Sequence, residues 1–397
     1  LPTMSTQPTV TLRPGKDRTL RQRHPWVFSG AIAGEPRNAA AGSTVRVVSA
    51  EGSFLAWGAY SPASQIRVRA WSFDEGDRVD DAFIARRVHA SAAMRSSLWD
   101  TTNAARLVFA ESDQLPGVIV DRYDDTAVLE LTTAGADLWR DAIADACMGI
   151  PGIRCVYERS DVDVRTKEGL GPQSGLLRGS EPGERIAVHE DSMQFLVDVR
   201  HGHKTGFYLD QREARRAVHS LSKGARVLNV FSYTGAFSVA AWKGGARSVA
   251  TVDSSAPALG LAKEHLRLNA CPESGIREAD AFTELRRLRD SGAEFDVVIL
   301  DPPKLVQSRQ HLDRGSRAYK DLNWLGMRLL APGGTLITFS CSGLVSADLH
   351  QKIVADAAVD AQRSAQLIAR LTQATDHPIL LSFPESAYLK GLVCRIA

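Results

Sequence analysis

The sequence predicts an α/β protein whose C-terminal half is a doubly wound parallel sheet, preceded by a small β-barrel and an α+β segment. From about residue 194 onward, short apolar runs bounded by turns alternate with helix-length segments, as in sheets covered on both faces. Two closing apolar segments follow with no helix-length pattern between them, which indicates an antiparallel hairpin at the sheet edge. Residues 9–72 alternate apolar and polar positions between Gly, Pro and Ser, a pattern typical of short strands.

These patterns divide the 397 residues into three expected domains. Residues 9–72 form the small β-barrel, residues 73–193 a central α+β domain, and residues 194–397 the doubly wound domain. In the central part, Phe83, Ile84 and Val88 have helical spacing and several strand-like pieces follow. The stretch 167–184 is rich in Gly, Pro and Ser, so we expect a loop there.

In the last domain, strands and helices are expected in strict alternation. The strands are "RVLNVF", "SVATVD", "IREAD", "FDVVILD" and "GTLITFSC", and the two segments of the final hairpin are "AQLIARLTQA" and "YLKGLVCRI". Each parallel strand is short and apolar, as a strand buried on both faces must be.

Composition excludes several classes of protein. No apolar run approaches membrane-spanning length, and five scattered cysteines without a CxxC pair argue against a disulfide framework and against zinc. We therefore expect a cytoplasmic protein with no membrane partner and no metal site. Residues 1–70 carry nine Lys/Arg and three Asp/Glu, a net charge of +6 on a chain whose net charge is +2. This basic module indicates a polyanion partner, although a solvated basic face accounts for it equally well.

Polar residues end the successive strands of the predicted parallel sheet. The first strand leads into "NVFSYTG", and the next ones end at Asp253, Asp280 and Asp301. A single acid at such a position is usually a helix cap, but three at the ligand edge of one sheet favour a binding site. Asp253 stands where a ribose-binding acid is expected, and the GxGxxG signature is absent. A cofactor with ribose and adenine but no phosphate fits this pattern, which describes S-adenosylmethionine.

A cysteine, Cys341, follows the apolar strand "GTLITFS" and stands between two serines. Taken alone, a cysteine there is best explained by packing. At the carboxyl edge of the sheet, beside the "DPPK" stretch of residues 301–304, it is instead a candidate nucleophile.

Over nearly its whole length the chain resembles the bacterial ribosomal RNA large-subunit methyltransferase I family. The resemblance is carried by "HKTGFYLDQREAR", "NVFSYTGAFSVAA", "FDVVILDPPK" and "LLAPGGTLITFSCSG", in the order of the family. The stretch "GSTVRVVSAEGSFLAWGAYSPASQIRVR" is similar to a PUA domain, a small β-barrel of RNA-modifying proteins. The resemblance implies a class I methyltransferase fold and methylation of C5 of a cytosine in 23S rRNA with S-adenosylmethionine. It also suggests a homodimer.

The resemblance implies cofactor roles for matching positions. Tyr208 would lie near the methionine part, and Phe231 and Gly235 in the glycine-loop motif. Asp253 would hold the ribose and Asp280 the adenine amino group. From its spacing, Asp210 is instead expected to form a capping box with Glu213.

The same resemblance places the chemistry on Cys341, Asp301 and Lys304. A thiolate of Cys341 would add to C6 of the base, and Asp301, which also adjoins the cofactor, would assist at N3. Lys304 takes the place where many RNA cytosine-C5 enzymes carry a second cysteine. It would hold a phosphate or the base carbonyl, unless it is a solvated loop lysine.

Two other functions are compatible with the residues. In the first, the fold and cofactor are the same, but the target is a nitrogen of guanine or adenine and Cys341 only packs. In the second, the chain is an RNA-binding assembly factor with a non-catalytic methyltransferase domain.

Overall fold

The computed structural model describes residues 7–36 and 38–397. Its chain forms two compact units. The first unit comprises the residues up to Val188 together with Val197–Leu209 and Thr375–Ser386, and the second comprises His189–Leu196, Asp210–Ala374 and Ala387–Ala397. Within the described ranges, none of the helices has both the length and the apolar character needed to cross a bilayer.

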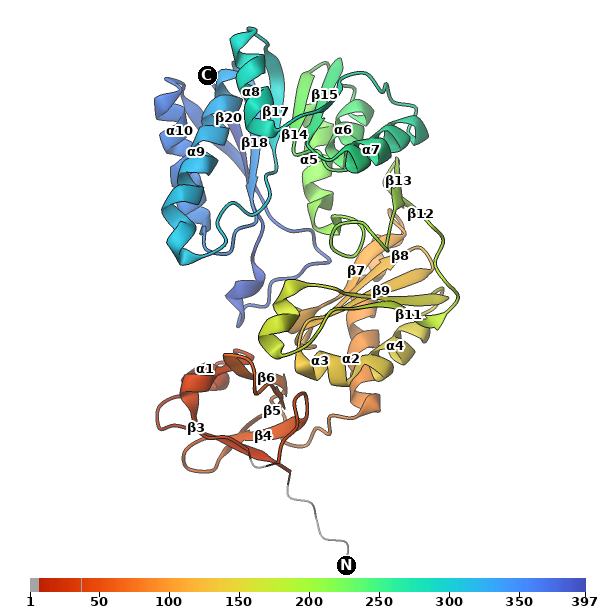
Figure 1. Cartoon of the computed structure of the whole chain (residues 1–397), viewed down its shortest axis with the longest axis vertical. Helices are drawn as coiled ribbons and strands as arrows, with labels where there is room; N and C mark the ends of the chain where they lie inside the picture. Colours follow the sequence, from red (N-terminus) through yellow and green to blue (C-terminus); the bar gives the residue numbers. More distant parts are fainter. Residues whose placement is uncertain (1–6, 37) are drawn as a thin grey trace, which may run out of the picture. The chain divides into compact units, whose positions relative to one another are not determined.

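The first unit begins with a six-stranded sheet in the order β2-β6-β5-β4-β1-β3 (Figure 1). Its strands are β1 (Thr9–Leu12), β2 (Trp26–Phe28), β3 (Ile32–Gly34), β4 (Thr44–Val48), β5 (Phe54–Tyr60) and β6 (Ile66–Ser72), with the short helix α1 (Arg18–Arg21). Val45 and Val47, at alternate positions of β4, are buried in one core together with Val68 of β6. This is the pattern of half-buried strands that the sequence predicts.

A five-stranded sheet in the order β11-β10-β9-β8-β7 makes up the rest of the first unit. Its strands are β7 (Ala104–Phe109), β8 (Val118–Tyr123), β9 (Thr126–Leu131), β10 (Cys155–Ser160) and β11 (Gln173–Gly179). The helices are α2 (Asp81–Ala93), α3 (Ala134–Leu138) and α4 (Arg140–Met148). Phe83, Ile84 and Val88 of α2 are buried in the core of this sheet, so the predicted helical spacing is confirmed.

The loop expected over residues 167–184 is wrong in its middle part. Residues Gln173–Gly179 form β11, which pairs with β10 in antiparallel register from Ser160↔Gln173 to Cys155↔Gly179. The strand has exposed residues at both ends and partly buried residues between them, so it shows no apolar run. The extended conformation of β11 is determined by its pairing with the edge of β10 and not by its local composition.

The second unit contains a seven-stranded sheet in the order β16-β15-β14-β17-β18-β20-β19. Its strands are β14 (Arg226–Val230), β15 (Ser248–Asp253), β16 (Ile276–Glu278), β17 (Phe295–Leu300), β18 (Leu330–Ser340), β19 (Ala365–Leu371) and β20 (Lys390–Ile396). The first five are parallel, and β20 is antiparallel to both of its neighbours. The predicted doubly wound sheet with an antiparallel terminal hairpin is therefore confirmed.

Helices cover both faces of this sheet (Figure 1). They are α5 (Arg212–Leu221), α6 (Ala236–Lys243), α7 (Ala256–Leu268), α8 (Ala281–Asp290), α9 (Leu312–Arg328) and α10 (Ala347–Asp360). Helix α6 packs against α5 and α7, and α9 packs against α8 and α10. The direction of winding changes between β14 and β17, so their carboxyl ends form the crevice where doubly wound sheets bind ligands.

A buried ion-pair cluster fixes α5, the helix that ends the "HKTGFYLDQREAR" motif. Glu190 is the last residue of β12 (Ile186–Glu190), which pairs with β13 (Met193–Val197). Its carboxylate accepts two hydrogen bonds from Arg215 at 2.7 and 2.6 Å. The Arg212 guanidinium lies 3.6 Å from the same carboxylate. All three side chains are buried, so this charge compensation takes place away from water.

The capping box expected from Asp210 and Glu213 does not form. Helix α5 begins after Gln211 without a side-chain cap. Asp210 instead accepts a hydrogen bond from the Tyr388 hydroxyl at 2.5 Å, and Glu213 pairs with Arg216 at 3.0 Å. The contact of Asp210 is therefore with Tyr388, which is distant in the sequence, and the local spacing pattern does not predict it. Asp210 has a structural role, as expected, but through this different contact.

We expect Glu190→Gln to lower the free energy of unfolding by about 3–5 kcal/mol, because it removes the buried anion faced by Arg212 and Arg215. Urea unfolding followed by circular dichroism measures this. The matched control is Glu213→Gln, whose half-exposed pair with Arg216 should contribute less than about 1 kcal/mol. Equal effects of the two variants would contradict the assignment.

Candidate active site

The strand ends of the second unit meet at one edge of the sheet. In the parallel registers, Val230 pairs with Leu300 and with Val252, and Leu300 pairs with Thr338. The residues that follow these positions therefore share the carboxyl edge. They include five of the predicted site residues, namely Phe231, Asp253, Asp301, Lys304 and Cys341. A sixth, Asp280, follows β16 at the same edge. Gly235 ends the loop that leaves β14.

The loop after β14 has a strained backbone. Phe231 and Tyr233 have left-handed φ angles of 62° and 49°, and Gly235 has φ of 74°. A Cβ at Gly235 would lie 2.9 Å from the Cβ of Ala262, so glycine is needed there for both reasons. The Phe231 side chain packs against the sheet core, which leaves its backbone facing the loop. Strain of this kind is found where a backbone approaches a ligand.

Asp253 holds this loop in place. Its carboxylate accepts hydrogen bonds from the Tyr233 amide at 2.7 Å and from the Ser255 amide at 2.9 Å. The cap of α7 is Ser255, which accepts from the Ala258 amide, so the alternative that Asp253 caps the helix is wrong. Each carboxylate oxygen can accept a second hydrogen bond, so Asp253 can still bind the two hydroxyl groups of a ribose.

Two buried hydroxyl groups of the same loop point to a polar ligand. Ser232 and Thr234 are 6% and 3% exposed. Within residues 7–36 and 38–397, neither hydroxyl group has a hydrogen-bond partner. Buried polar groups without a partner are rare and call for an explanation. Hydroxyl groups, a carboxylate and loop amides form a donor and acceptor set that fits the amino acid and ribose parts of S-adenosylmethionine.

Asp280 caps α8, as single acids at strand ends often do. Its side chain accepts from the Thr283 amide at 2.9 Å and from the Thr283 hydroxyl at 2.8 Å. These hydrogen bonds lower the pKa of Asp280, so it is an anion at neutral pH. The residue is exposed, and the adenine role implied by the family resemblance stays a prediction.

Asp301 follows β17 and has a partner that the sequence did not indicate. The amide nitrogen of Gln211 donates to Asp301 Oδ2 at 2.9 Å. Gln211 is 4% exposed, whereas Asp301 is half-buried. In the motif "LDQRE" the acidic residues are the obvious candidates for a functional role. The spacing of the motif does not show that Gln211 is the residue that reaches Asp301. Gln211 therefore orients one oxygen of the carboxyl group and leaves the group partly accessible.

Cys341 lies just after the last residue of β18 and is half-buried, so it is not enclosed in the sheet packing. Its neighbours Ser340 and Ser342 are fully buried. Both serine hydroxyls meet the hydroxyl of Tyr319 on α9, at 3.1 and 3.0 Å. The two serines thus fix the backbone on either side of the thiol.

The same hydrogen-bond network extends to the DPPK loop. The Val306 amide, just past Lys304, donates to the Ser342 hydroxyl at 3.3 Å. Burial raises the pKa of the Tyr319 hydroxyl, which bonds to the same Ser342. Cys341 and the DPPK loop are therefore held by one buried tyrosine. Lys304 itself is exposed.

Two residues of this network were missed by sequence reasoning. Tyr319 binds the hydroxyl groups of both serines. Lys390, within the predicted closing segment "YLKGLVCRI", donates from Nζ to the Ser342 carbonyl at 2.8 Å. For Tyr319 a signal existed, because a buried tyrosine hydroxyl needs a partner. For Lys390 the only signal was a charged residue within an apolar strand.

Tyr208 lies in the first compact unit. Its hydroxyl is 3.3 Å from His203 Nδ1, and Lys204 Nζ lies 4.3 Å from the centre of its ring. The predicted contact of Tyr208 with the methionine part of the cofactor stays a prediction.

The other cysteines are poorly suited to nucleophilic chemistry. Burial raises the pKa of Cys147 to about 12 and that of Cys155 and Cys394 to about 11. Burial also raises the pKa of Cys271, which is half-buried. A raised pKa keeps a thiol protonated and unreactive near pH 7, which leaves Cys341 as the candidate.

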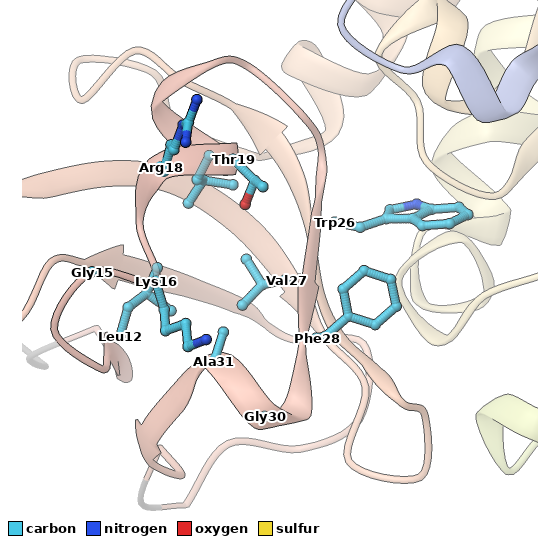
Figure 2. Close-up of a pocket in the computed structure, with 11 residues that line it drawn as sticks. Leu12, Gly15, Lys16, Arg18, Thr19, Trp26, Val27, Phe28, Gly30 and Ala31 are labelled. Atoms are coloured by element: carbon cyan, nitrogen blue, oxygen red, sulfur yellow. The ribbon is translucent and has the colours of Figure 1, made fainter.

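A second candidate site lies on the small N-terminal sheet. An open cavity of about 480 Å³ has Lys16 and Arg18 on one side and Trp26 and Phe28 on the other (Figure 2). Lys16 and Arg18 are exposed, and in the described part of the chain neither has an acidic partner within 4 Å. Phe28 is 52% exposed. Exposed cations beside an exposed aromatic ring suit a nucleic-acid strand.

Trp26 has a structural role. It is half-buried, donates from its indole nitrogen to Glu111 at 2.8 Å, and packs 4.7 Å from the ring centre of Phe383. The neighbouring Phe28 is therefore the aromatic ring free to contact a ligand.

Comparison with known proteins adds family relationships to this geometry. Residues 10–73 match the PUA-like domain family, and residues 171–395 match a family of S-adenosylmethionine-dependent methyltransferases. The chain is 50% identical over 391 residues to the ribosomal RNA large subunit methyltransferase I of Alteromonas mediterranea, covering 98% of each chain. It is 48% identical over 396 residues to the protein of the same name from Shewanella denitrificans, covering 98% of this chain and 99% of that protein.

Solved structures share the fold over the whole chain. A SAM-dependent methyltransferase from Streptococcus mutans superposes with a TM-score of 0.84 at 22% identity, covering 98% of this chain and 99% of that one. A methyltransferase complexed with S-adenosylhomocysteine superposes with a TM-score of 0.85 at 22% identity, with the same coverage. This likeness confirms the predicted fold class.

We expect Tyr319→Phe to lower the free energy of unfolding by about 1–3 kcal/mol, because it deprives the buried hydroxyls of Ser340 and Ser342 of their shared partner. Thermal or urea unfolding measures the change. The control is Tyr157→Phe at a half-buried position of β10, where less than about 0.5 kcal/mol is expected. An unchanged stability of Tyr319→Phe would show that the network does not hold the loop.

Proposed function

We propose that this chain, which belongs to the ribosomal RNA large subunit methyltransferase I family, methylates C5 of a cytosine in 23S rRNA through a covalent adduct with Cys341. Dependence on S-adenosylmethionine and the PUA-like domain follow from the family matches. The target atom and the covalent mechanism are the proposal. The observation that carries it is the half-buried Cys341, whose neighbour Ser342 is hydrogen-bonded to Tyr319 and to the Val306 amide just past the DPPK residues.

The binding roles in this proposal follow the edge of the sheet. Asp253 accepts the ribose hydroxyls, Asp280 accepts from the adenine amino group, and the loop from Phe231 to Gly235 receives the rest of the cofactor through its backbone. Tyr208 is assigned to the methionine part, and Asp301 adjoins the cofactor. When bound, S-adenosylmethionine supplies an electrophilic methyl group. We also propose that residues 9–72 form a domain that docks RNA, residues 73–193 a central α+β domain, and residues 194–397 the domain that carries out methyl transfer.

The chain's own residues then provide the covalent steps. The Cys341 thiolate forms a bond to C6 of the cytosine, and the Asp301 carboxyl group gives its proton to N3, so that electron density moves to C5. After C5 has gained the methyl group, a base removes the C5 hydrogen. The bond between C6 and sulfur breaks, the thiolate leaves, and the N3 proton returns to the Asp301 carboxylate. Lys304 binds a phosphate or the base carbonyl beside this site.

We expect Cys341→Ala to lower the rate of methyl transfer by more than about 1000-fold, because the covalent step is lost. Affinity for S-adenosylmethionine should change by less than about twofold, since the predicted cofactor residues belong to other strand ends. Single-turnover transfer to 23S rRNA and calorimetry measure the two quantities. The matched control is Cys394→Ala, a buried cysteine of β20. Normal turnover by Cys341→Ala would remove the thiol from the mechanism.

A substrate with 5-fluorocytidine extends this test to the target atom. The C5 hydrogen that must leave is absent from this base, so the enzyme and RNA should stay joined by a bond that survives denaturing electrophoresis. Nucleoside analysis of the normal product should show 5-methylcytidine. Methylation of a guanine or adenine nitrogen would contradict the proposal.

We propose that the cavity beside Lys16, Arg18 and Phe28 docks the RNA backbone. In a plot of log affinity against log salt concentration, the double variant Lys16→Ala and Arg18→Ala should have a slope that is smaller in magnitude by roughly 1.4–1.8. The reason is that two phosphate contacts are lost. Filter binding of the rRNA target at several salt concentrations measures the slope.

The control for this slope is the double variant Arg46→Ala and Arg178→Ala. Arg46 is already paired with Glu75, and Arg178 with Asp141 and Asp145, so their removal should change the slope by less than about half as much. The same slope for the cavity variant and the wild type would place the RNA on another surface.

A further inference from the structure

A lysine of the terminal hairpin lies beside the proposed nucleophile. In the antiparallel register of β18 and β20, Lys390 is the partner of Ser340, and Cys341 is the next residue. Residues that face each other across antiparallel strands extend to the same side of the sheet. The register therefore sets Lys390 opposite Ser340, one position before Cys341, on the strand that borders the end of β18.

The position of the ammonium group is fixed by a hydrogen bond. Lys390 Nζ donates to the Ser342 carbonyl at 2.8 Å, and Ser342 follows Cys341 directly. The Lys390 side chain is half-buried, and no carboxylate among the described residues lies within 4 Å of its nitrogen. A half-buried cation without an acidic partner is costly in a folded chain, so one carbonyl contact alone is a weak reason for lysine in this apolar strand.

The charged and titratable groups around Lys390 indicate which of them can interact with its positive charge. Burial lowers the pKa of Lys390, the negative charge of a Cys341 thiolate raises it, and Lys304 lowers it. From α10, His350 is buried and has a pKa lowered to about 4, so it is neutral at pH 7. From α9, Tyr319 has a raised pKa and is a neutral phenol. Of these groups, Lys304 adds positive charge near Lys390, and Cys341 adds negative charge only as a thiolate.

We infer that Lys390 is a positioning residue that stabilises the thiolate form of Cys341 and so keeps the nucleophile ionised at neutral pH. An ammonium group beside a thiolate favours the charged form of both. The hydrogen bond to the Ser342 carbonyl holds the cation in place without neutralising it. This inference rests on the proposed function for its catalytic meaning, but the interaction itself can be measured without catalysis.

The experiment is the pH profile of Cys341 alkylation by iodoacetamide in the full chain, measured by peptide mass spectrometry in the absence of RNA. Lys390→Met should raise the pH of half-maximal reactivity by ~1 unit, because the thiolate loses its cation. At pH 7 the alkylation rate should fall by about threefold, since a more basic thiolate reacts faster and offsets part of the loss. The other cysteines, with raised pKa values, serve as internal references.

Further variants separate the charge from the hydrogen bond and from folding. Lys390→Gln can still donate to the Ser342 carbonyl and should shift the profile as Lys390→Met does. Lys390→Arg keeps the charge, and its profile should stay within about 0.3 units of the wild type. Lys352→Met, at an exposed position of α10, is the matched control. Affinity for S-adenosylhomocysteine confirms that each variant is folded.

Each result decides the inference. A raised midpoint for both Lys390→Met and Lys390→Gln, with wild-type profiles for Lys390→Arg and Lys352→Met, supports it. A wild-type profile for folded Lys390→Gln overturns it. If Cys341→Ala retains methyl transfer while the alkylation shift is present, the proposed function fails and the thiolate interaction stands. If Cys341→Ala is inactive and no shift occurs, the proposed function stands without Lys390.

Discussion

The arrangement of the site depends on the hydroxyl of one buried tyrosine. Tyr319 bonds to Ser340 and Ser342, on either side of Cys341, and Ser342 also bonds to the backbone that continues the DPPK loop. Two strand ends that are 40 residues apart in the sequence are thereby held in one geometry. A nucleophile and an acid must be fixed to within a fraction of an ångström to act on the same base. The hydrogen bonds of the two serines would meet this requirement in the mechanism that we propose.

Backbone strain is concentrated on the other side of the crevice. The loop from Phe231 to Gly235 has three left-handed residues, and the Asp253 carboxylate holds it through the Tyr233 amide. The same carboxylate is the predicted ribose ligand. If Asp253 holds the ribose as predicted, this one side chain links cofactor binding to loop geometry, and a change at Asp253 would alter both.

The sequence predicted the parallel sheet and its acidic strand ends because buried strands leave a clear apolar pattern and ligand sites follow their carboxyl ends. It did not predict the partners of those residues. Gln211 reaches Asp301, and Lys390 reaches Ser342, across separations of 90 and 48 residues. Such contacts depend on strand register and helix packing. For the same reason β11 was taken as a loop and Asp210 was assigned to a capping box, since local composition and spacing carry no information about distant partners.

The strand order of the catalytic sheet has a consequence for synthesis of the protein. Among the described residues, β20 comes after the other strands, yet it lies between β18 and β19 and pairs Lys390 with Ser340, the residue before Cys341. While the ribosome is still making residues 390–396, β18 has an open edge and the cysteine lacks this lysine. The nascent chain therefore cannot complete this edge of the sheet until β20 has left the exit tunnel.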